Sequence, residues 1–389
     1  MTESGVPMKK RMRILVAHDV SRRRNGGASR IMGFIHDQLV TAGHSVDYLC
    51  AEDVPPGLNG RLARFAFPIL VRRHAVAGAR SGKPYDVINV HEPSAAAVST
   101  CKGAAGNPIV VVTSHGVERR GWDLALEELR SGREGPSLKT RLIYPLTSLW
   151  QSGLGLRRAD HVFCLSSEDR QYLMRRFNVS QNKITRIYPA AHPIYAAVAD
   201  QGDYARADRL LFAGTWRKNK GIEDLVPAFV NLAAHHPELK LIVLGAGAPE
   251  ATVRAAFPKE VRSRVSCTQT ASEAETAAAF ASADIYLLPS LFEGTPLTLI
   301  EAMMSGMPIV TTSTCGMRDV VQDRKNGLLV PVRSPGAIVG AVELLINDRA
   351  FRARLGRAAK AEALAKYTWE RVAAPVRKVY EQLCEQGIR

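Results

Sequence analysis

The segment from residue 284 to residue 312 constrains the fold more than any other part of the chain, because it contains a complete strand–helix–strand unit. The runs Asp284–Leu288 and Ile309–Thr312 are short and mostly apolar, as buried strands are. The residues between them carry helix-boundary signals at both ends, which predict a helix from about Pro296 to Ser305. Parallel strands joined by a helix belong to an α/β sheet, which binds phosphate-bearing ligands at the carboxyl ends of its strands.

The start of this helix is well marked and has a glutamate on either side. Thr295 suits the N-cap of this helix, and Pro296 suits its first position. Gly306 suits the position just after the helix ends, and Pro308 follows soon after. Glu293 lies in the loop before the helix, and Glu301 lies in its second turn. The free N–H groups of such a helix start favour an anion.

Apolar strands alternate with helical segments along most of the chain. The expected strands are 13–18, 46–50, 87–90, 109–113, 162–165 and 184–187 in the first half, and 209–213, 240–244, 265–268, 284–288, 309–312 and 327–330 in the second. Such alternation indicates a mainly parallel, doubly wound sheet in each half. We therefore predict a first domain over residues 1–190, a linker over 191–208 and a second domain over 209–368.

Composition excludes several classes of protein. A chain of 389 residues is too long to fold around a single hydrophobic core. No apolar run approaches the roughly 18 residues that a membrane span needs. The apolar stretch after the basic N-terminus is too short for an export signal, so we expect a cytoplasmic protein. The six cysteines are widely separated and form no metal-binding or redox pair, which suits a reducing compartment.

The formal net charge is +15, and most of this excess lies in residues 1–200. The arginine clusters there suit an anionic membrane surface, with the protein peripheral on its inner face, or an acidic acceptor. Alternatively, the clusters have no specific partner and reflect an organism whose proteins are generally rich in arginine. The clusters are dispersed and accompany no nucleic-acid-binding motif, so we do not expect nucleic acid as a partner.

The motifs around the two glutamates resemble the signature of family 4 glycosyltransferases of the GT-B fold. The matching pieces are Phe292–Pro296, Glu301–Met303 and Gly306–Pro308, between the two strands. The resemblance is close over residues 209–330 and looser over 11–190. It implies an α/β fold of two Rossmann-like domains facing across a cleft, with a last helix, residues 369–389, that returns to the first domain.

The resemblance also implies roles for residues of the second domain. Glu293 would hold hydroxyls of a donor sugar as a catalytic residue, and Glu301 would bind the ribose of the nucleotide. Lys220 matches the lysine of the family's phosphate loop, but Thr215 stands where relatives usually have an arginine, so Arg217 is the substitute we expect at the diphosphate. The remaining expected donor contacts are Gly214, Gly245, Gly294, Thr295, Pro296 and Leu297.

In the first domain the resemblance points to polar residues at strand ends. His115 would lie near the donor sugar and diphosphate as a catalytic residue, while His91 and Glu92 would lie on the acceptor side. Gly26 and Gly27 would let the backbone approach the donor. The segment 121–156 has no clear counterpart, and it is an acceptor site, a membrane-facing surface or an ordinary helical excursion.

The expected activity is retaining transfer of a hexose from a nucleoside diphosphate sugar to a glycan or lipid-linked acceptor, in the synthesis of cell-surface polysaccharide or glycolipid. We expect no cofactor and no metal, because the chain has no Asp-x-Asp pair that would hold a cation at the diphosphate. A nucleotide-sugar epimerase of the same fold is the alternative enzyme. A non-catalytic protein that binds nucleotide sugars is the third alternative.

Overall fold

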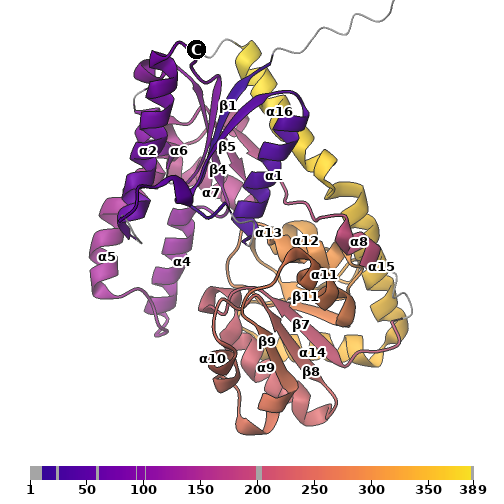
Figure 1. The fold of residues 1–389 in the computed structure, drawn as a ribbon. Coiled ribbons are helices and arrows are strands. Elements are labelled where there is room, and N and C mark those ends of the chain that lie inside the picture. Colours follow the sequence, from indigo (N-terminus) through magenta and orange to yellow (C-terminus); the bar gives the residue numbers. More distant parts are fainter. Residues whose placement is uncertain are drawn as a thin grey trace, which may run out of the picture. The chain divides into compact units, whose positions relative to one another are not determined.

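The computed structural model describes residues 11–22, 26–57, 61–92, 94–100, 102–198 and 204–386. They form two compact units, each built around a six-stranded parallel sheet (Figure 1). Unit 1 comprises Met1–Phe163, Tyr172–Thr185 and Ala373–Arg389, and unit 2 comprises Cys164–Gln171 and Arg186–Val372.

The sheet of unit 1 has the strand order β2-β1-β3-β4-β5-β6. Its strands are β1 (Arg13–Ala17), β2 (Ser45–Leu49), β3 (Val87–His91), β4 (Ile109–Ser114), β5 (His161–Cys164) and β6 (Ile184–Arg186). β1, β3, β4 and β5 are almost completely buried. Helices cover both faces of such a parallel sheet, so its central strands are mostly apolar.

Eight helices lie wholly or mainly in unit 1 among the described residues. They are α1 (Gly27–Thr41), α2 (Arg61–Arg80), α3 (Ala95–Ser99), α4 (Glu118–Arg130), α5 (Leu138–Tyr144), α6 (Trp150–Arg158), α7 (Ser167–Phe177) and α16 (Trp369–Glu385), with a π-helical turn, η3 (Pro145–Leu149), between α5 and α6. α1 buries Ile31, Ile35 and Leu39 at four-residue spacing, as its sequence predicts. In α16 the Tyr380 hydroxyl accepts a hydrogen bond of 2.5 Å from the side chain of Asn89 in β3.

The sheet of unit 2 has the order β12-β11-β10-β7-β8-β9. Its strands are β7 (Arg209–Ala213), β8 (Lys240–Leu244), β9 (Val265–Thr268), β10 (Ile285–Leu288), β11 (Ile309–Thr312) and β12 (Leu328–Val330). Leu210 and Phe212 of β7 enter one buried apolar cluster, whereas Leu211 and Ala213 enter another. Alternate residues of a strand point to opposite faces, so this sheet is covered on both sides.

The helices of unit 2 cover the two faces of its sheet. They are α8 (Ile194–Val198), α9 (Ile222–His235), α10 (Glu250–Ala255), α11 (Glu273–Ser282), α12 (Leu297–Met304), α13 (Cys315–Val320), α14 (Pro335–Asn347) and α15 (Arg349–Lys366). Across both units, no helix of the described residues is long and apolar enough to cross a membrane.

The predicted α/β class and all twelve predicted strands are confirmed. The predicted start of the helix after Glu293 is wrong by one residue, because α12 begins at Leu297 and Pro296 is its N-cap. Thr295 makes no side-chain cap. Its hydroxyl instead donates a hydrogen bond to the carbonyl of Leu165, a tertiary partner that local sequence does not reveal.

Candidate active site

The strand orders locate the ligand-binding edge of each sheet. In unit 2, β7 lies between β8 and β10, so the chain reverses its direction of winding between β7 and β10. In unit 1 the corresponding point lies between β1 and β3. Open α/β sheets bind ligands at these points, outside the carboxyl ends of the strands. Most of the residues singled out by the sequence follow these four strands or the neighbouring β4.

An ion pair joins the two loops at the switch point of unit 2. Lys220 Nζ lies 2.7 Å from Glu293 Oε1, and both side chains are mostly buried. The Ser290 hydroxyl donates a 2.6 Å hydrogen bond to the same carboxylate oxygen. Lys220 comes from the loop after β7 and Glu293 from the loop after β10, so the fold brings together the two residues that the sequence placed at a diphosphate and a sugar.

Glycines let these loops touch through their backbones. Gly221 has φ +75°, and a Cβ there would lie 1.9 Å from the carbonyl oxygen of Pro289. The Leu291 N–H donates to the Asn219 carbonyl at 2.8 Å in the same contact. No side chain fits such a gap, so Gly221 is required for the close approach that positions Lys220.

A second backbone contact fixes the segment just before α12. The Gly316 N–H donates to the carbonyl of Gly294 at 2.8 Å, and a Cβ on Gly316 would lie 1.9 Å from that oxygen. Thr295 and Leu297 are buried, and the Thr295 hydroxyl is already bonded within unit 2. Any ligand contact of residues 294–297 therefore falls to their backbone.

Other expected donor residues lie around the same edge but contribute differently. The Gly214 N–H bonds to the Leu244 carbonyl at 2.9 Å, which ties the loop after β7 to β8. Gly245 has φ +67°, a conformation that favours glycine, and marks the turn after β8. Arg217 is exposed and forms no ion pair with any described residue. The structure does not join it to the Lys220–Glu293 pair.

Glu301 lies on α12 with no exposed surface. Its charge and that of Glu293 both contribute to raising the pKa of the buried Tyr286 phenol, although burial itself is the largest cause. The Tyr286 hydroxyl donates to Thr298 at 2.8 Å. Both glutamates therefore lie close enough to one buried phenol of β10 to affect its pKa.

Three histidines meet at the corresponding edge of unit 1. They are His18 after β1, His91 at the end of β3 and His115 just after β4. The His91 and His115 rings lie 4.9 Å apart, and His91 Nδ1 lies 3.3 Å from the Asp19 carboxylate. We call this group the histidine cluster.

Burial keeps His115 neutral. Both ring nitrogens are shielded from solvent and have no hydrogen-bond partner among the described residues. Burial lowers the pKa of His115 well below its usual 6.5, and the nearby His91 and His18 lower it further. The pKa of His18 falls to about 4, first because of burial and then because of His91. A neutral His115 can exchange hydrogen bonds with a hydroxyl, but it brings no positive charge to a phosphate.

Glu92 is a buried acid that holds unit 1 together. It accepts hydrogen bonds from the Ser114 hydroxyl at 2.7 Å, from the Glu118 N–H at 3.2 Å and from the Ser152 hydroxyl. These donors lie on β4, α4 and α6. Burial, followed by the nearby Glu118, raises the pKa of Glu92 to about 7. The carboxyl group is thus occupied by its own unit.

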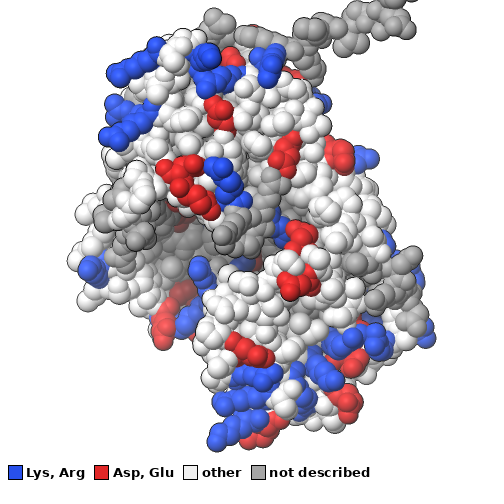
Figure 2. Space-filling view, viewed as in Figure 1, with Lys and Arg blue, Asp and Glu red and all other residues white. Residues whose placement is uncertain are grey.

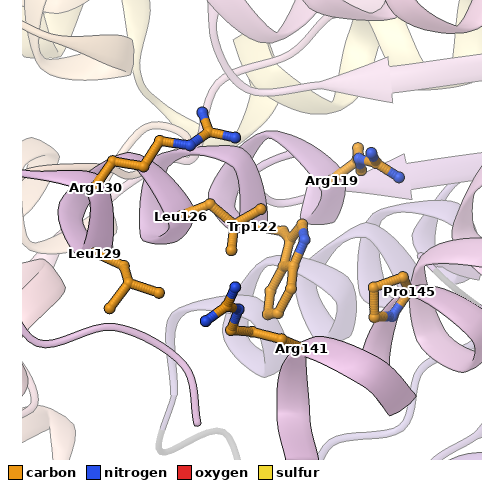
Figure 3. A pocket seen from close by; sticks show the side chains of 7 residues that line it. All are labelled: Arg119, Trp122, Leu126, Leu129, Arg130, Arg141 and Pro145. Carbon is orange, nitrogen blue, oxygen red and sulfur yellow. The ribbon is translucent and has the colours of Figure 1, made fainter. Parts of the chain in front are cut away.

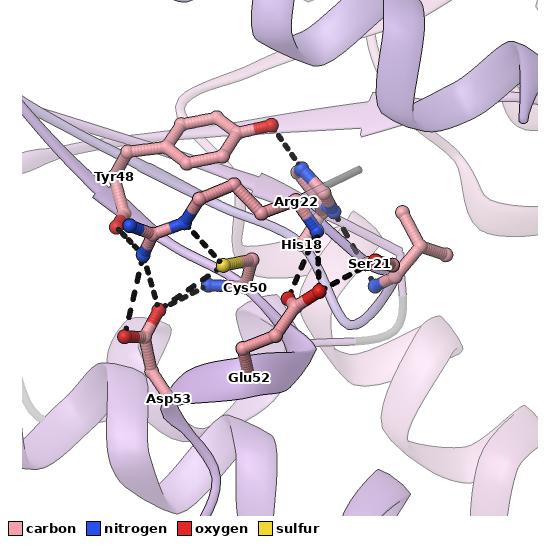
Figure 4. A network of polar contacts seen from close by, with 8 residues as sticks. His18, Ser21, Arg22, Tyr48, Cys50, Glu52 and Asp53 are labelled. Atoms are coloured by element: carbon pink, nitrogen blue, oxygen red, sulfur yellow. Dashed lines mark hydrogen bonds and ion pairs between the residues drawn. The ribbon is translucent and has the colours of Figure 1, made fainter. Parts of the chain in front are cut away.

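The loop after β1 is tied to the end of β2 by a polar network (Figure 4). The Ser21 hydroxyl and the Arg22 N–H donate to Glu52, and the Arg22 guanidinium contacts Cys50 and Asp53. This loop leads to Gly26, the N-cap of α1, where a Cβ would meet only Ser29 Oγ at 3.6 Å. Gly26 and Gly27 are exposed, so the protein itself does not require a glycine at 26.

Two residues, one at the ligand-binding edge of each sheet, were not predicted from the sequence. His18 follows a buried strand as His91 and His115 do, so the same signal would have found it. Ser290 precedes Glu293 by three residues, but only the structure shows that its hydroxyl orients the carboxylate. Among the described residues, no group of three or more His, Cys, Asp or Glu side chains is placed to hold a metal ion.

Two Rossmann-like units are the architecture of the GT-B fold, and comparison with known proteins identifies the family. Residues 25–193 match the family described as Glycosyltransferase Family 4, and residues 199–362 match that described as Glycosyl transferases group 1. The chain belongs to family 4 of the glycosyltransferases and is a glycosyltransferase.

Several relatives and solved structures are similar to this chain. A phosphatidyl-myo-inositol mannosyltransferase of Mycolicibacterium smegmatis is 26% identical over 88% of this chain and 83% of its own length. An uncharacterized glycosyltransferase of Methanocaldococcus jannaschii is 25% identical over 57% of this chain and 59% of its own. A sucrose-phosphate synthase from Thermosynechococcus elongatus has the same fold, with a TM-score of 0.76, 22% identity, and coverage of 96% of this chain and 99% of that one.

Proposed function

We propose that this glycosyltransferase moves a hexose from a nucleoside diphosphate sugar to a glycan or lipid-linked acceptor, with retention of the donor's configuration and without a metal ion. The observation that carries the proposal is the Lys220–Glu293 pair, 2.7 Å apart at the switch point of unit 2. It places a fixed cation beside a fixed carboxylate at the edge where α/β sheets bind nucleotides.

Lys220 and the N-terminus of α12 supply positive charge for a leaving diphosphate. Negative charge grows on the diphosphate as the glycosidic bond breaks, and preorganised donors lower the barrier. Lys220 provides a full positive charge, and the free N–H groups of α12 provide a partial one. We propose that Arg217 adds a further charge from its exposed position when donor binds.

The remaining groups orient the sugar and the nucleotide. Glu293, held by Ser290, accepts hydrogen bonds from the sugar hydroxyls, and Glu301 accepts those of the ribose. We propose that the neutral His115 bonds to the donor sugar and that Gly26 and Gly27 leave room for the substrate. His91 and Glu92 serve the acceptor side, Glu92 by holding β4, α4 and α6 in place through its own hydrogen bonds. The departing phosphate takes the proton of the acceptor, so the reaction needs no dedicated protein base.

The names of similar proteins support this range of substrates. The relatives include mannosyltransferases of phosphatidyl-myo-inositol and glycosyltransferases of D-inositol 3-phosphate. The Anabaena protein HepE, whose structure contains UDP-glucose, has the same fold at a TM-score of 0.68, with 17% identity over 96% of this chain and all of that one. We propose a cytoplasmic enzyme of glycolipid or polysaccharide synthesis, peripheral to an anionic membrane.

The test begins with a thermal-shift screen of UDP, GDP and ADP sugars, because a ligand of the native state raises its melting temperature. Transfer from the selected donor is then measured for Glu293→Gln and for Glu223→Gln. Glu223, in the first turn of α9, pairs with Lys218 at an exposed position and serves as the control. Loss of transfer only in Glu293→Gln supports the proposal. Equal rates in both variants contradict it, and donor turnover without any acceptor would indicate the epimerase.

A further inference from the structure

A row of large apolar side chains lies exposed on unit 1. The exposed fractions are 72% for Leu138, 71% for Leu142, 79% for Leu146 and 61% for Trp150. These residues recur at every fourth position along the continuous helical segment of α5, η3 and α6. Apolar residues at this spacing normally mark the face that a helix buries. We call the row the apolar ridge.

The π-helical turn keeps the ridge on one face. In an α-helix with 3.6 residues per turn, each step of four residues advances about 40° beyond a full turn, so a long row drifts around the axis. The wider turn at Pro145–Leu149 offsets part of this drift for Leu146 and Trp150. Pro145 lacks an N–H and cannot continue the α-helical ladder, which accounts for a distortion at this point.

Hollows lie on both flanks of the ridge. Between α4 and α5 is a hollow of about 320 Å³, whose walls include Trp122, Leu126, Arg130 and Arg141 (Figure 3). Between α2 and α5 is one of about 250 Å³, lined among others by Phe65, Lys139 and Ile143. Phe65 and Ile143 are themselves exposed, so apolar surface continues from the ridge across to α2.

The cations beside the ridge are not neutralised. Arg130, Lys139 and Arg141 form no ion pair with any described residue, whereas Arg119 pairs with Asp123 and Arg133 with Glu128. The ridge therefore combines exposed apolar surface with positive charge that forms no ion pair with the described residues, and an anionic lipid surface complements both.

Elsewhere charges of both signs are mixed. On the face in view in Figure 2, Lys and Arg side chains gather in several separate groups with Asp and Glu between them.

We propose that the apolar ridge docks on a bilayer that contains anionic phospholipid. Leu138, Leu142, Leu146 and Trp150 enter the boundary between headgroups and acyl chains, while Arg130, Lys139 and Arg141 contact lipid phosphates. A second copy of the chain is a poorer occupant, because a symmetric contact would bring the same cations together. The inference assigns a face to the membrane association proposed above and does not depend on sugar transfer.

The test is co-sedimentation of the full chain with vesicles of equal phosphatidylglycerol and phosphatidylcholine, and with phosphatidylcholine alone, at low and high salt. Leu142→Ser/Leu146→Ser removes two ridge residues, and Val332→Ser/Leu364→Ser removes two exposed apolar residues of unit 2 as the matched control. Lys139→Gln/Arg141→Gln removes two ridge cations, with Lys259→Gln/Lys325→Gln as its control. Melting temperatures and donor binding establish that each variant is folded, whatever its membrane affinity.

We expect wild type and both controls to bind the anionic vesicles at low salt and to leave them as salt rises. The ridge variant should bind on the order of 100-fold more weakly, and the charge variant roughly 30-fold more weakly. The proposal is overturned if wild type ignores anionic vesicles, if the ridge variant binds as wild type does, or if phosphatidylcholine alone binds equally well. A dimer that the ridge variant abolishes, without vesicle binding, would assign the ridge to a second copy.

Discussion

Replacing Lys220 by methionine removes its charge but keeps a side chain of similar length. The stem of Lys220 passes about 3.9 Å from the position of a Cβ on Gly214, so a shorter side chain would also open space there. The Lys220 ammonium is the fixed cation we assign to the leaving diphosphate. Removing one preorganised donor of this kind costs about 10²–10³ in kcat, or about 2.7–4 kcal/mol in the barrier.

The same substitution leaves Glu293 without its partner, and this affects stability as well as rate. Removing one member of a buried ion pair costs about 3–5 kcal/mol. The Lys220 and Glu293 side chains keep 21% and 12% exposure, so solvent screening should reduce that cost. A double variant, Lys220→Met/Glu293→Gln, should recover part of the stability without recovering the rate.

The assay is steady-state transfer well below the melting temperature of each variant, together with calorimetric titration of nucleoside diphosphate. Lys218→Met is the matched control, since Lys218 lies two residues away and pairs with Glu223 at an exposed position. We expect Lys218→Met to retain wild-type rates. Near-normal kcat for Lys220→Met, or equal losses in the two variants, would refute the assignment.

Two further predictions concern buried acids. Glu301→Ala should weaken nucleotide binding at least about tenfold in calorimetric titration, because it removes the proposed ribose acceptor; unchanged affinity would contradict that role. Glu92 has a folded-state pKa of about 7 against an ordinary 4.5, so the folded state retains a proton that the unfolded state releases. Stability from this group therefore falls as pH rises from about 4.5 to about 7, by on the order of 3 kcal/mol. As pH rises across this window, the melting temperature of Glu92→Gln should increase relative to that of wild type. A difference between the two that stays constant would show that Glu92 does not titrate there.

Much of the fold followed from the sequence because each strand is a short apolar run bounded by turn residues. The switch points then place the residues after β1, β3, β7 and β10 near one another within each unit. Thr295 shows where local rules fail, since its hydroxyl bonds to a carbonyl 130 residues earlier in the chain. Sequence spacing gives no sign of such a partner.

The apolar ridge shows a second limit. Leu138, Leu142 and Leu146 have the spacing of a buried helix face, and from sequence alone that face would be assigned to a core. Only the structure shows that the described residues leave it exposed. The state of His115 is similar, because its neutrality depends on burial and on two other histidines that are distant in the sequence.

Retaining transfer without a metal ion can be checked by determining the anomeric configuration of the product. Transfer from the selected donor would be followed by NMR in excess EDTA, with the anomeric proton of the first-formed product read before any equilibration. We expect a product with the donor's configuration, formed at a rate that chelator does not change. An inverted product, or a rate that collapses with EDTA and returns with Mg²⁺ or Mn²⁺, would contradict it.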